Sequence, residues 1–171
     1  MIDLNTIASG NHLYGLEWTP RFGYDASATL FSCLGGDSGE FMARVAAGEP
    51  QVPQIQHDFA AGVRLSIPPY PSECDGYFHE GVPINGIEEE SLSHTYLYDA
   101  MLDESGNLVT AGCSGFIAVP MAAGDSIEHV FGLLAAQIKH IKIPDMQYRN
   151  DIQKCCKIRY EQLSRDGWFR D

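Results

Sequence analysis

The sequence predicts an α+β fold, because strand-like and helix-like segments are grouped along the chain rather than alternating. A hairpin-like pair of segments and two short helices come first, a block of short strands fills the middle, and two amphipathic helices come last. This grouping is typical of α+β proteins, whereas a parallel α/β sheet alternates strand and helix. The 171 residues, of which 44% are apolar and 20% charged, suffice for one ordinary domain with a buried core.

Composition and charge exclude several classes of protein. The net charge of −12, from 11 basic and 23 acidic residues, disfavours binding to nucleic acid or to anionic membranes. The apolar runs are too short to span a bilayer, and the first residues do not form a secretory signal. Five cysteines without a CxxC pair indicate free, buried thiols in a reducing compartment, so we expect a cytoplasmic location. The locally basic stretch after Lys139 is interpreted as a solvated helix face.

The first part of the chain predicts a hairpin followed by two helices. Residues 1–7 and 13–19 alternate apolar and polar side chains around the turn cluster Ser9-Gly10-Asn11. A short helix is expected over residues 26–33. A second helix begins after the N-cap Asp37, with Glu40 completing a capping box, and ends at Gly48. The polar residues 49–59 predict an extended linker.

The middle of the chain predicts short antiparallel strands. Residues 62–67 are expected to form one strand, which the prolines at 68–71 end, and residues 81–86 are expected to form a turn. Residues 94–102 alternate well enough to predict a single strand. A hairpin loop over residues 103–107 leads into a return strand that begins at Leu108, and residues 116–121 predict a further strand.

Two helices are expected at the end of the chain. Asp125 and Glu128 form a second capping-box pattern. The apolar residues that follow lie on one helical face: Ile127, Val130, Phe131, Leu134, Ile138 and Ile141. We expect this helix to lie on the sheet and to end before Pro144. A last helix begins at Asp151 and turns one face inward, formed by Ile152, Cys155, Cys156, Tyr160 and Leu163.

Residues 15–25 carry the candidate chemistry. Glu17 and Thr19 lie on one face of a predicted strand, because side chains two apart point the same way. A carboxylate and a hydroxyl oxygen form a reasonable pair of Mg²⁺ ligands. Arg21, four residues after Glu17, is suited to holding a phosphate or a carboxylate. The alternative interpretation is a surface ion pair between Glu17 and Arg21. The six histidines show no metal-binding spacing, and neither a P-loop nor a GxSxG motif is present.

Six segments resemble motifs of the glycinamide ribonucleotide synthetase (phosphoribosylamine–glycine ligase) family in the same order. Residues 17–25 resemble E-F-N-x-R-F-G-D-P-E, residues 41–48 resemble LLxAAxG, residues 67–86 resemble GYPxxYxKGxxIxGL, residues 102–110 resemble xDExGxLVTxGGR, residues 124–126 resemble the start of LGDTLEEA, and residues 148–152 resemble xYRxDIG. Each motif alone is weak. Their common order over residues 13–152 makes the resemblance specific.

The resemblance implies part of an ATP-grasp ligase of purine biosynthesis, which joins a carboxylate to an amine through an acyl phosphate with ATP and Mg²⁺. Residues 1–52 then correspond to the end of an ATP-grasp lobe, a remnant made of the β-hairpin and helices. Residues 53–152 correspond to a small antiparallel β-rich C-terminal domain with a packed helix, and residues 153–171 to a helical extension. The lobe that binds the nucleotide has no counterpart in this sequence.

The resemblance also implies roles for four residues. Glu17 and Thr19 are expected to contact the metal, and Glu17, Arg21 and Asp25 to contact the nucleotide or the acyl phosphate. Arg21 is the expected catalytic residue, because it would position the reacting carboxylate. A small-molecule substrate is implied for the complete enzyme.

The chain departs from the family motifs where substrates are expected to bind. Thr19 replaces an asparagine, and Asp25 matches the motif aspartate only after a shift of one residue. The arginine that follows two glycines in the family has no counterpart in residues 112–115. These departures indicate a diverged homologue with different substrates.

Two functions remain open at this point. One is a portion of a ligase, completed by the missing ATP-grasp half. The other is a non-catalytic interaction or assembly module whose N-terminal hairpin edge pairs with a second copy or with another chain.

Overall fold

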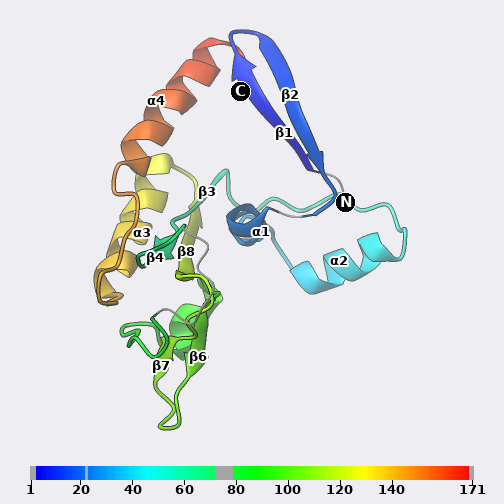
Figure 1. Ribbon diagram of the computed structural model, residues 1–171. Coiled ribbons are helices and arrows are strands. Elements are labelled where there is room, and N and C mark those ends of the chain that lie inside the picture. The colour runs from blue at the N-terminus through cyan, green and yellow to red at the C-terminus, as the bar shows by residue number, and fades with distance from the viewer. Residues whose placement is uncertain (1–2, 22, 72–78, 170–171) are drawn as a thin grey trace.

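The computed structural model describes residues 3–21, 23–71 and 79–169, which form antiparallel sheets, four α-helices and one 3-10 helix (Figure 1). The elements follow in this order: β1 (Asp3–Ser9), β2 (His12–Thr19), α1 (Tyr24–Phe31), α2 (Ser38–Ala46), β3 (Phe59–Gly62), β4 (Leu65–Ser66), η1 (Glu89–Ser93), β5 (Thr95–Leu97), β6 (Ala100–Leu102), β7 (Leu108–Thr110), β8 (Phe116–Gly124), α3 (Ile127–His140) and α4 (Ile152–Arg165). The α+β prediction is confirmed. Residues 1–2 of the predicted first strand and Cys74 lie outside the described residues.

Strands β1 and β2 form a two-stranded hairpin that projects from the rest of the molecule (Figure 1). Gly10 turns the chain with a φ of +56°, a conformation that glycine adopts without steric cost. The register shifts at a bulge between Asn5 and Thr6. The indole Nε1 of Trp168 donates to the Gly10 carbonyl at 2.7 Å, so the end of the chain meets the hairpin turn.

Both predicted N-terminal helices are present. The Asp37 carboxylate caps α2 by accepting hydrogen bonds from the backbone N–H groups of Gly39 and Glu40, at 2.8 and 3.0 Å. Gly48, with a φ of +77°, follows the last turn of α2, as predicted.

Strand β8 is the centre of the main sheet and pairs with β3, β4 and β5. The prediction of one strand over residues 62–67 is wrong, because the ladder is interrupted between β3 and β4. Both strands oppose β8 in the same register, with Gly62 opposite Met121 and Leu65 opposite Ala118. The gap lies beside Pro120, which has no N–H group to donate to the ladder.

The predicted strand over residues 94–102 is also divided in two. Asp99, 4% exposed, interrupts it between β5 and β6. Its carboxylate accepts hydrogen bonds from the backbone N–H groups of Cys113, Ser114 and Gly115, at 2.8, 2.7 and 2.6 Å. These bonds satisfy the backbone N–H groups of the loop before β8. They also mark the point where the chain stops pairing with β8, through β5, and begins to pair with β7, through β6.

The hairpin loop over residues 103–107 is confirmed between β6 and β7, whereas the predicted turn over residues 81–86 is wrong. Residues 82–85 are extended and form isolated bridges from Pro83 to Val109 and from Asn85 to Lys142, and the chain turns only at Gly81 and Gly86. Its hydrogen bonds therefore connect the β6–β7 hairpin to the end of α3.

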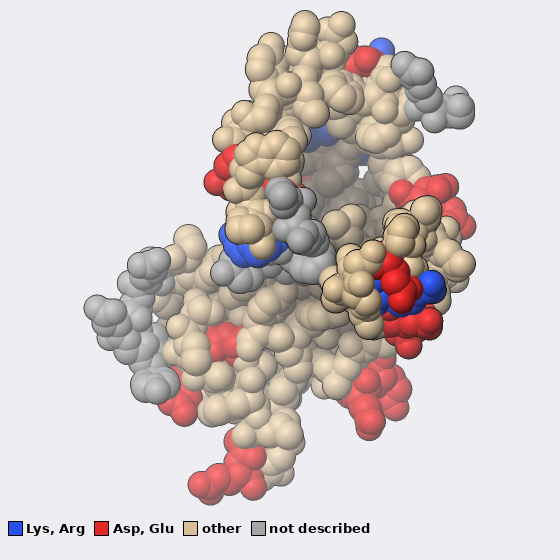
Figure 2. All heavy atoms as spheres, turned by 90° about the vertical axis from the view of Figure 1, so that its right-hand side faces the viewer, with Lys and Arg blue, Asp and Glu red and all other residues tan. Residues whose placement is uncertain are grey.

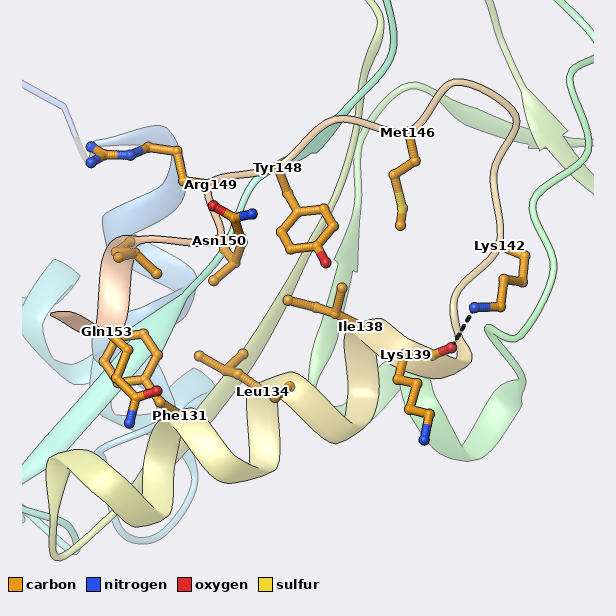
Figure 3. A pocket seen from close by; sticks show the side chains of 13 residues that line it. Phe131, Leu134, Ile138, Lys139, Lys142, Met146, Tyr148, Arg149, Asn150 and Gln153 are labelled. Carbon is orange, nitrogen blue, oxygen red and sulfur yellow. Dashed lines mark hydrogen bonds between the residues drawn. The ribbon is translucent and has the colours of Figure 1, made fainter. Parts of the chain in front are cut away.

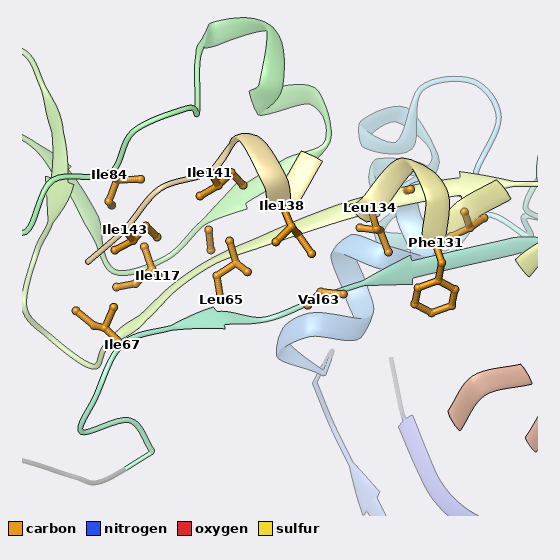
Figure 4. Close-up of a cluster of buried hydrophobic side chains, with 13 residues drawn as sticks. Val63, Leu65, Ile67, Ile84, Ile117, Phe131, Leu134, Ile138, Ile141 and Ile143 are labelled. Carbon is orange, nitrogen blue, oxygen red and sulfur yellow. The ribbon is translucent and has the colours of Figure 1, made fainter. Parts of the chain in front are cut away.

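Helix α3 packs across the sheet and completes the core, as predicted (Figure 4). Its N-cap is Ser126 rather than Asp125, since the Ser126 hydroxyl accepts from the His129 N–H while Asp125 lies 3.2 Å from His57 Nδ1. The buried side chains that α3 and the strands share include Val63, Leu65, Ile117, Val130, Leu134 and Ile138. The predicted inward face of α4 is its less exposed face, although none of its residues is buried.

The surface of the protein is acidic, and carboxylates are scattered over the face drawn in Figure 2, where basic side chains are few. The four described cysteines, Cys33, Cys113, Cys155 and Cys156, are free thiols, as predicted, but their predicted burial is wrong, since Cys113 is exposed and the other three are only partly buried. No helix in the described part of the chain has the length and hydropathy needed to cross a membrane.

Candidate functional site

Glu17 and Thr19 share one face of the hairpin, where Asn5 connects them. Asn5 lies opposite Glu17 in the register of β1 and β2. Its Nδ2 group donates to Glu17 Oε1 at 3.1 Å and to Thr19 Oγ1 at 3.2 Å. Three oxygen-bearing side chains therefore lie together on an open surface, at the end of the hairpin that leads into α1.

These three residues could supply only some of the oxygen ligands that a hard cation needs. Carboxylate, hydroxyl and amide oxygens suit Mg²⁺, which commonly keeps several waters and takes further oxygens from substrate phosphates. Glu17 is the one carboxylate in the set, and the described residues contain no group of three or more His, Cys, Asp or Glu able to hold a metal ion. A cation at Glu17 would therefore need oxygens from a nucleotide or another chain.

The other two predicted site residues lie elsewhere. Arg21 is exposed in the segment that connects β2 to α1. Asp25 lies in the first turn of α1, where Oδ2 accepts hydrogen bonds from Arg64 Nη2 at 2.6 Å and from Arg64 Nε at 3.0 Å. The structure thus brings Glu17 and Thr19 together and pairs Asp25 with an arginine that the sequence analysis did not single out.

Arg64 is held by one carboxylate and by aromatic rings. Its Nη1 group donates to the Tyr70 hydroxyl, and its guanidinium carbon lies 4.5 Å from the centre of the Phe116 ring. Burial by itself would lower the pKa of Arg64, but the hydrogen bonds and the negative charge of Asp25 outweigh it and raise the pKa. Arg64 is therefore a fixed cation in a position set by its partners.

The Asp25–Arg64 pair lines a cavity of about 540 Å³, together with Tyr70, Tyr148 and Arg149. This volume is within the ~300–1,000 Å³ that ligand pockets commonly enclose. The second carboxylate oxygen of Asp25, Oδ1, is buried and accepts no hydrogen bond. A buried acceptor without a donor is costly, so this oxygen adds to the free-energy cost of holding Asp25 in place.

Arg149, which also lines this cavity, is paired with Asp151 at the start of α4. Arg149 Nε and Nη2 donate to the two Asp151 oxygens at 2.9 and 2.8 Å, a bidentate arrangement. The hydrogen bonds from Arg149 are the largest cause that lowers the pKa of Asp151, to about 2.

We expect this ion pair to stabilise the fold above the ordinary Asp pKa near 4 and to lose that effect as the pH falls toward about 2, because a lowered folded-state pKa favours folding only while the unfolded carboxylate is ionised. An NMR titration of the Asp151 carboxyl carbon checks this. Arg149→Met should return the midpoint to the ordinary Asp range, whereas Arg159→Met, a matched change on α4, should leave it unchanged. An unaltered midpoint in Arg149→Met would contradict the assignment.

Sequence reasoning missed Asn5 and Arg64. Arg64 had a visible signal, because it is the one charged residue in the otherwise apolar and small segment 62–67. Asn5 had none, because its position opposite Glu17 depends on the bulge in β1 and β2.

Comparison with known proteins bears on the fold. No protein-family model matches the sequence, and no match is found among curated proteins. Among solved structures, the chain is similar to phosphoribosylamine–glycine ligase from Thermotoga maritima, with a TM-score of 0.70 and 20% sequence identity. The similarity covers 88% of this chain and 36% of that ligase chain.

The solved ligase is thus much longer than this chain, which spans little more than a third of it. At 20% identity the likeness concerns the backbone arrangement and leaves the substrates of this chain open. The chain therefore has the fold of a part of phosphoribosylamine–glycine ligase, in agreement with the family that its ordered motifs indicate.

Proposed function

We propose that this chain supplies one wall of the catalytic cleft of an ATP-dependent carboxylate–amine ligase related to phosphoribosylamine–glycine ligase. The observation that carries the proposal is the fold likeness, which includes 88% of this chain but 36% of the ligase. In this view β1, β2, α1 and α2 are the end of an ATP-grasp lobe, the remaining strands with α3 are the C-terminal domain, and α4 is an extension. The nucleotide-binding lobe is supplied from outside these 171 residues.

Within this proposal the hairpin residues face the nucleotide. Glu17 and Thr19, both hydrogen-bonded by the Asn5 amide, would offer oxygens to a Mg²⁺ ion that is also held by ATP phosphates. The bound ion would offset the charge of the phosphates while ATP activates a carboxylate as an acyl phosphate. Arg21, exposed next to the hairpin, would orient that carboxylate.

The cavity beside α1 is the substrate-facing part of the proposed wall. The Asp25–Arg64 ion pair and the Tyr70 hydroxyl give this wall the polar groups that would bind a small substrate. The proposed substrate is a small molecule with a polar group that can hydrogen-bond to this wall.

Calorimetric titration with Mg²⁺-ATP tests the nucleotide-facing role. We expect weak binding by the chain, which Glu17→Ala removes because the single carboxylate of the set is lost. Glu104→Ala, which removes an exposed carboxylate from the β6–β7 loop, should bind as the parent does. Binding that survives Glu17→Ala, or an absence of binding in the parent chain, would contradict the proposed role of the hairpin.

A second candidate function is that of an interaction module, and one observation favours it. One face of the hairpin is apolar and open to solvent, with Leu13 53% and Trp18 70% exposed and Leu4 opposite Trp18. A two-stranded ribbon with an exposed apolar face is marginal alone, and its free edges can pair with another strand. The partner proposed for this face is a second copy of the chain.

Sedimentation velocity tests this second function. The parent chain is expected to form a dimer that dissociates on dilution, and the double variant Leu13→Ser/Trp18→Ser is expected to be monomeric. Leu102→Ser removes a leucine of similar exposure, 66%, from β6, away from the hairpin, and should leave the dimer intact. A parent chain that is monomeric at high concentration would rule out self-association through this face.

A further inference from the structure

A second cavity, of about 390 Å³, lies where the end of α3, the segment 142–150 and the start of α4 meet. It adjoins the cavity beside Asp25 and shares Tyr148 and Arg149 with it. Figure 3 shows Leu134, Ile138, Met146 and Tyr148 turned toward a common space. The volume is large enough for a small ligand.

The floor of this cavity is apolar and deeply buried. Leu134 is 1% exposed and Ile138 8% exposed, and Phe131 and Val63 complete the floor beside them. A hydrocarbon chain that enters a cavity with such a floor leaves water for apolar surroundings, and this transfer is favourable.

The rim of the cavity is cationic. Lys139 and Lys142 lie at one edge and Arg149 at the opposite edge (Figure 3). Among the residues that the structure describes, no aspartate or glutamate lines the cavity, although the chain has 23 acidic and only 11 basic residues. The local charge is thus opposite to that of the whole protein, which favours an anion at this place.

The cations at the two edges differ in whether a carboxylate already binds them. Arg149 is held by Asp151 through two hydrogen bonds. Lys142 Nζ donates to the carbonyl oxygen of Lys139 at 2.7 Å, and Lys139 has no carboxylate partner in the described chain. The partial negative charge at the end of α3 opposes an anion there, but two full positive charges exceed it. The lysine edge is therefore the place for an anionic group.

We propose that this cavity binds a small aliphatic carboxylate, with the hydrocarbon chain on the floor formed by Leu134 and Ile138 and the carboxylate at Lys139 and Lys142. The site is independent of the proposed ligase chemistry, because it requires neither Glu17 nor Asp25. It is a ligand site next to the candidate substrate cavity, and Val63, Tyr148, Arg149 and Ile152 line both cavities.

The test uses decanoate, with decanol and decylammonium as uncharged and cationic probes of equal chain length, and calorimetry or NMR shift changes as the readout. Decanoate is expected to bind up to about fivefold more tightly than decanol for each lysine that it contacts, the range of an exposed ion pair. Added salt should reduce this difference. Octanoate should bind more weakly than decanoate by roughly fourfold for each methylene removed from the floor.

Two pairs of matched variants locate the ligand. Ala135 lines the cavity and Ala136 does not, and both are exposed on α3, so Ala135→Phe should block binding while Ala136→Phe should not. Lys139→Glu should remove the preference for decanoate over decanol, whereas Lys154→Glu, the same change on an exposed part of α4, should preserve it. Equal affinity for all three head groups, or binding unaffected by Ala135→Phe, would overturn the proposal.

Discussion

Replacing Leu134 with aspartate is expected to unfold the protein. Leu134 is 1% exposed and lies on the face of α3 that packs on the sheet. The variant loses the burial of a leucine side chain and places an unpaired carboxylate in an apolar core, at a combined cost of about 5 kcal/mol or more. This is comparable to the whole stability of many domains, roughly 5–15 kcal/mol. Urea unfolding followed by circular dichroism, together with the dispersion of amide NMR signals, measures the effect.

The neighbouring residue provides the control for this prediction. Leu133 lies on the same helix and is 40% exposed, so Leu133→Asp tests the same chemical change outside the core. It should alter the free energy of unfolding by about 1 kcal/mol or less. Equal stability of the Leu134→Asp variant and the parent would show that α3 does not pack on the sheet through this face.

Gly86→Ala is expected to have the second-largest effect. Gly86 has a φ of +79°, and a Cβ atom built on it would lie 2.1 Å from the carbonyl oxygen of His140, the last residue of α3. The backbone there is fixed by the reciprocal hydrogen bonds of Asn85 and Lys142, at 3.0 and 2.9 Å. The variant combines the strain of a left-handed alanine with a steric overlap, and should lose about 3 kcal/mol of stability.

Gly106→Ala separates the two causes. Gly106 has a similar φ of +82° in the β6–β7 loop, but nothing lies within 4 Å of the position its Cβ would take. It should therefore show the conformational cost alone, about 1 kcal/mol. Parallel thermal and urea unfolding of the two variants gives the difference. Equal losses of stability would mean that the contact between the segment around Gly86 and the end of α3 is not tight.

Local patterns in the sequence predicted most of the helices and the two hairpins, because their signals are side-chain periodicity, caps and turn residues within a few positions. The errors in the β-rich middle have longer-range causes. The strand over residues 62–67 is interrupted by Pro120 on the strand opposite, and the strand over residues 94–102 is interrupted by the hydrogen bonds of Asp99 to a later loop. Neither partner is near in sequence, so alternation alone predicted continuous strands.

In the candidate site too, the local relations between residues were predicted and the long-range ones were not. The spacing of Glu17 and Thr19 predicted that they share a face, because the strand period is a local property. Asn5 could not be assigned to them, because counting from the turn without the bulge places Leu16 opposite Asn5, and the bulge replaces it with Glu17. The pairing of Asp25 with Arg64 joins residues 39 apart, which only the packing of α1 beside β3 brings together.

The most direct measurement for the proposed ligase role is to locate a divalent ion on the chain by paramagnetic NMR. Mn²⁺ prefers the same oxygen ligands as Mg²⁺, and it broadens the amide signals of nearby residues. With Mn²⁺ and ATP, the proposal predicts selective broadening at Asn5, Glu17 and Thr19, which Glu17→Ala abolishes and Glu104→Ala does not. Broadening confined to another acidic segment, such as Glu88-Glu89-Glu90, would contradict the assignment of the hairpin as the metal-facing wall of the cleft.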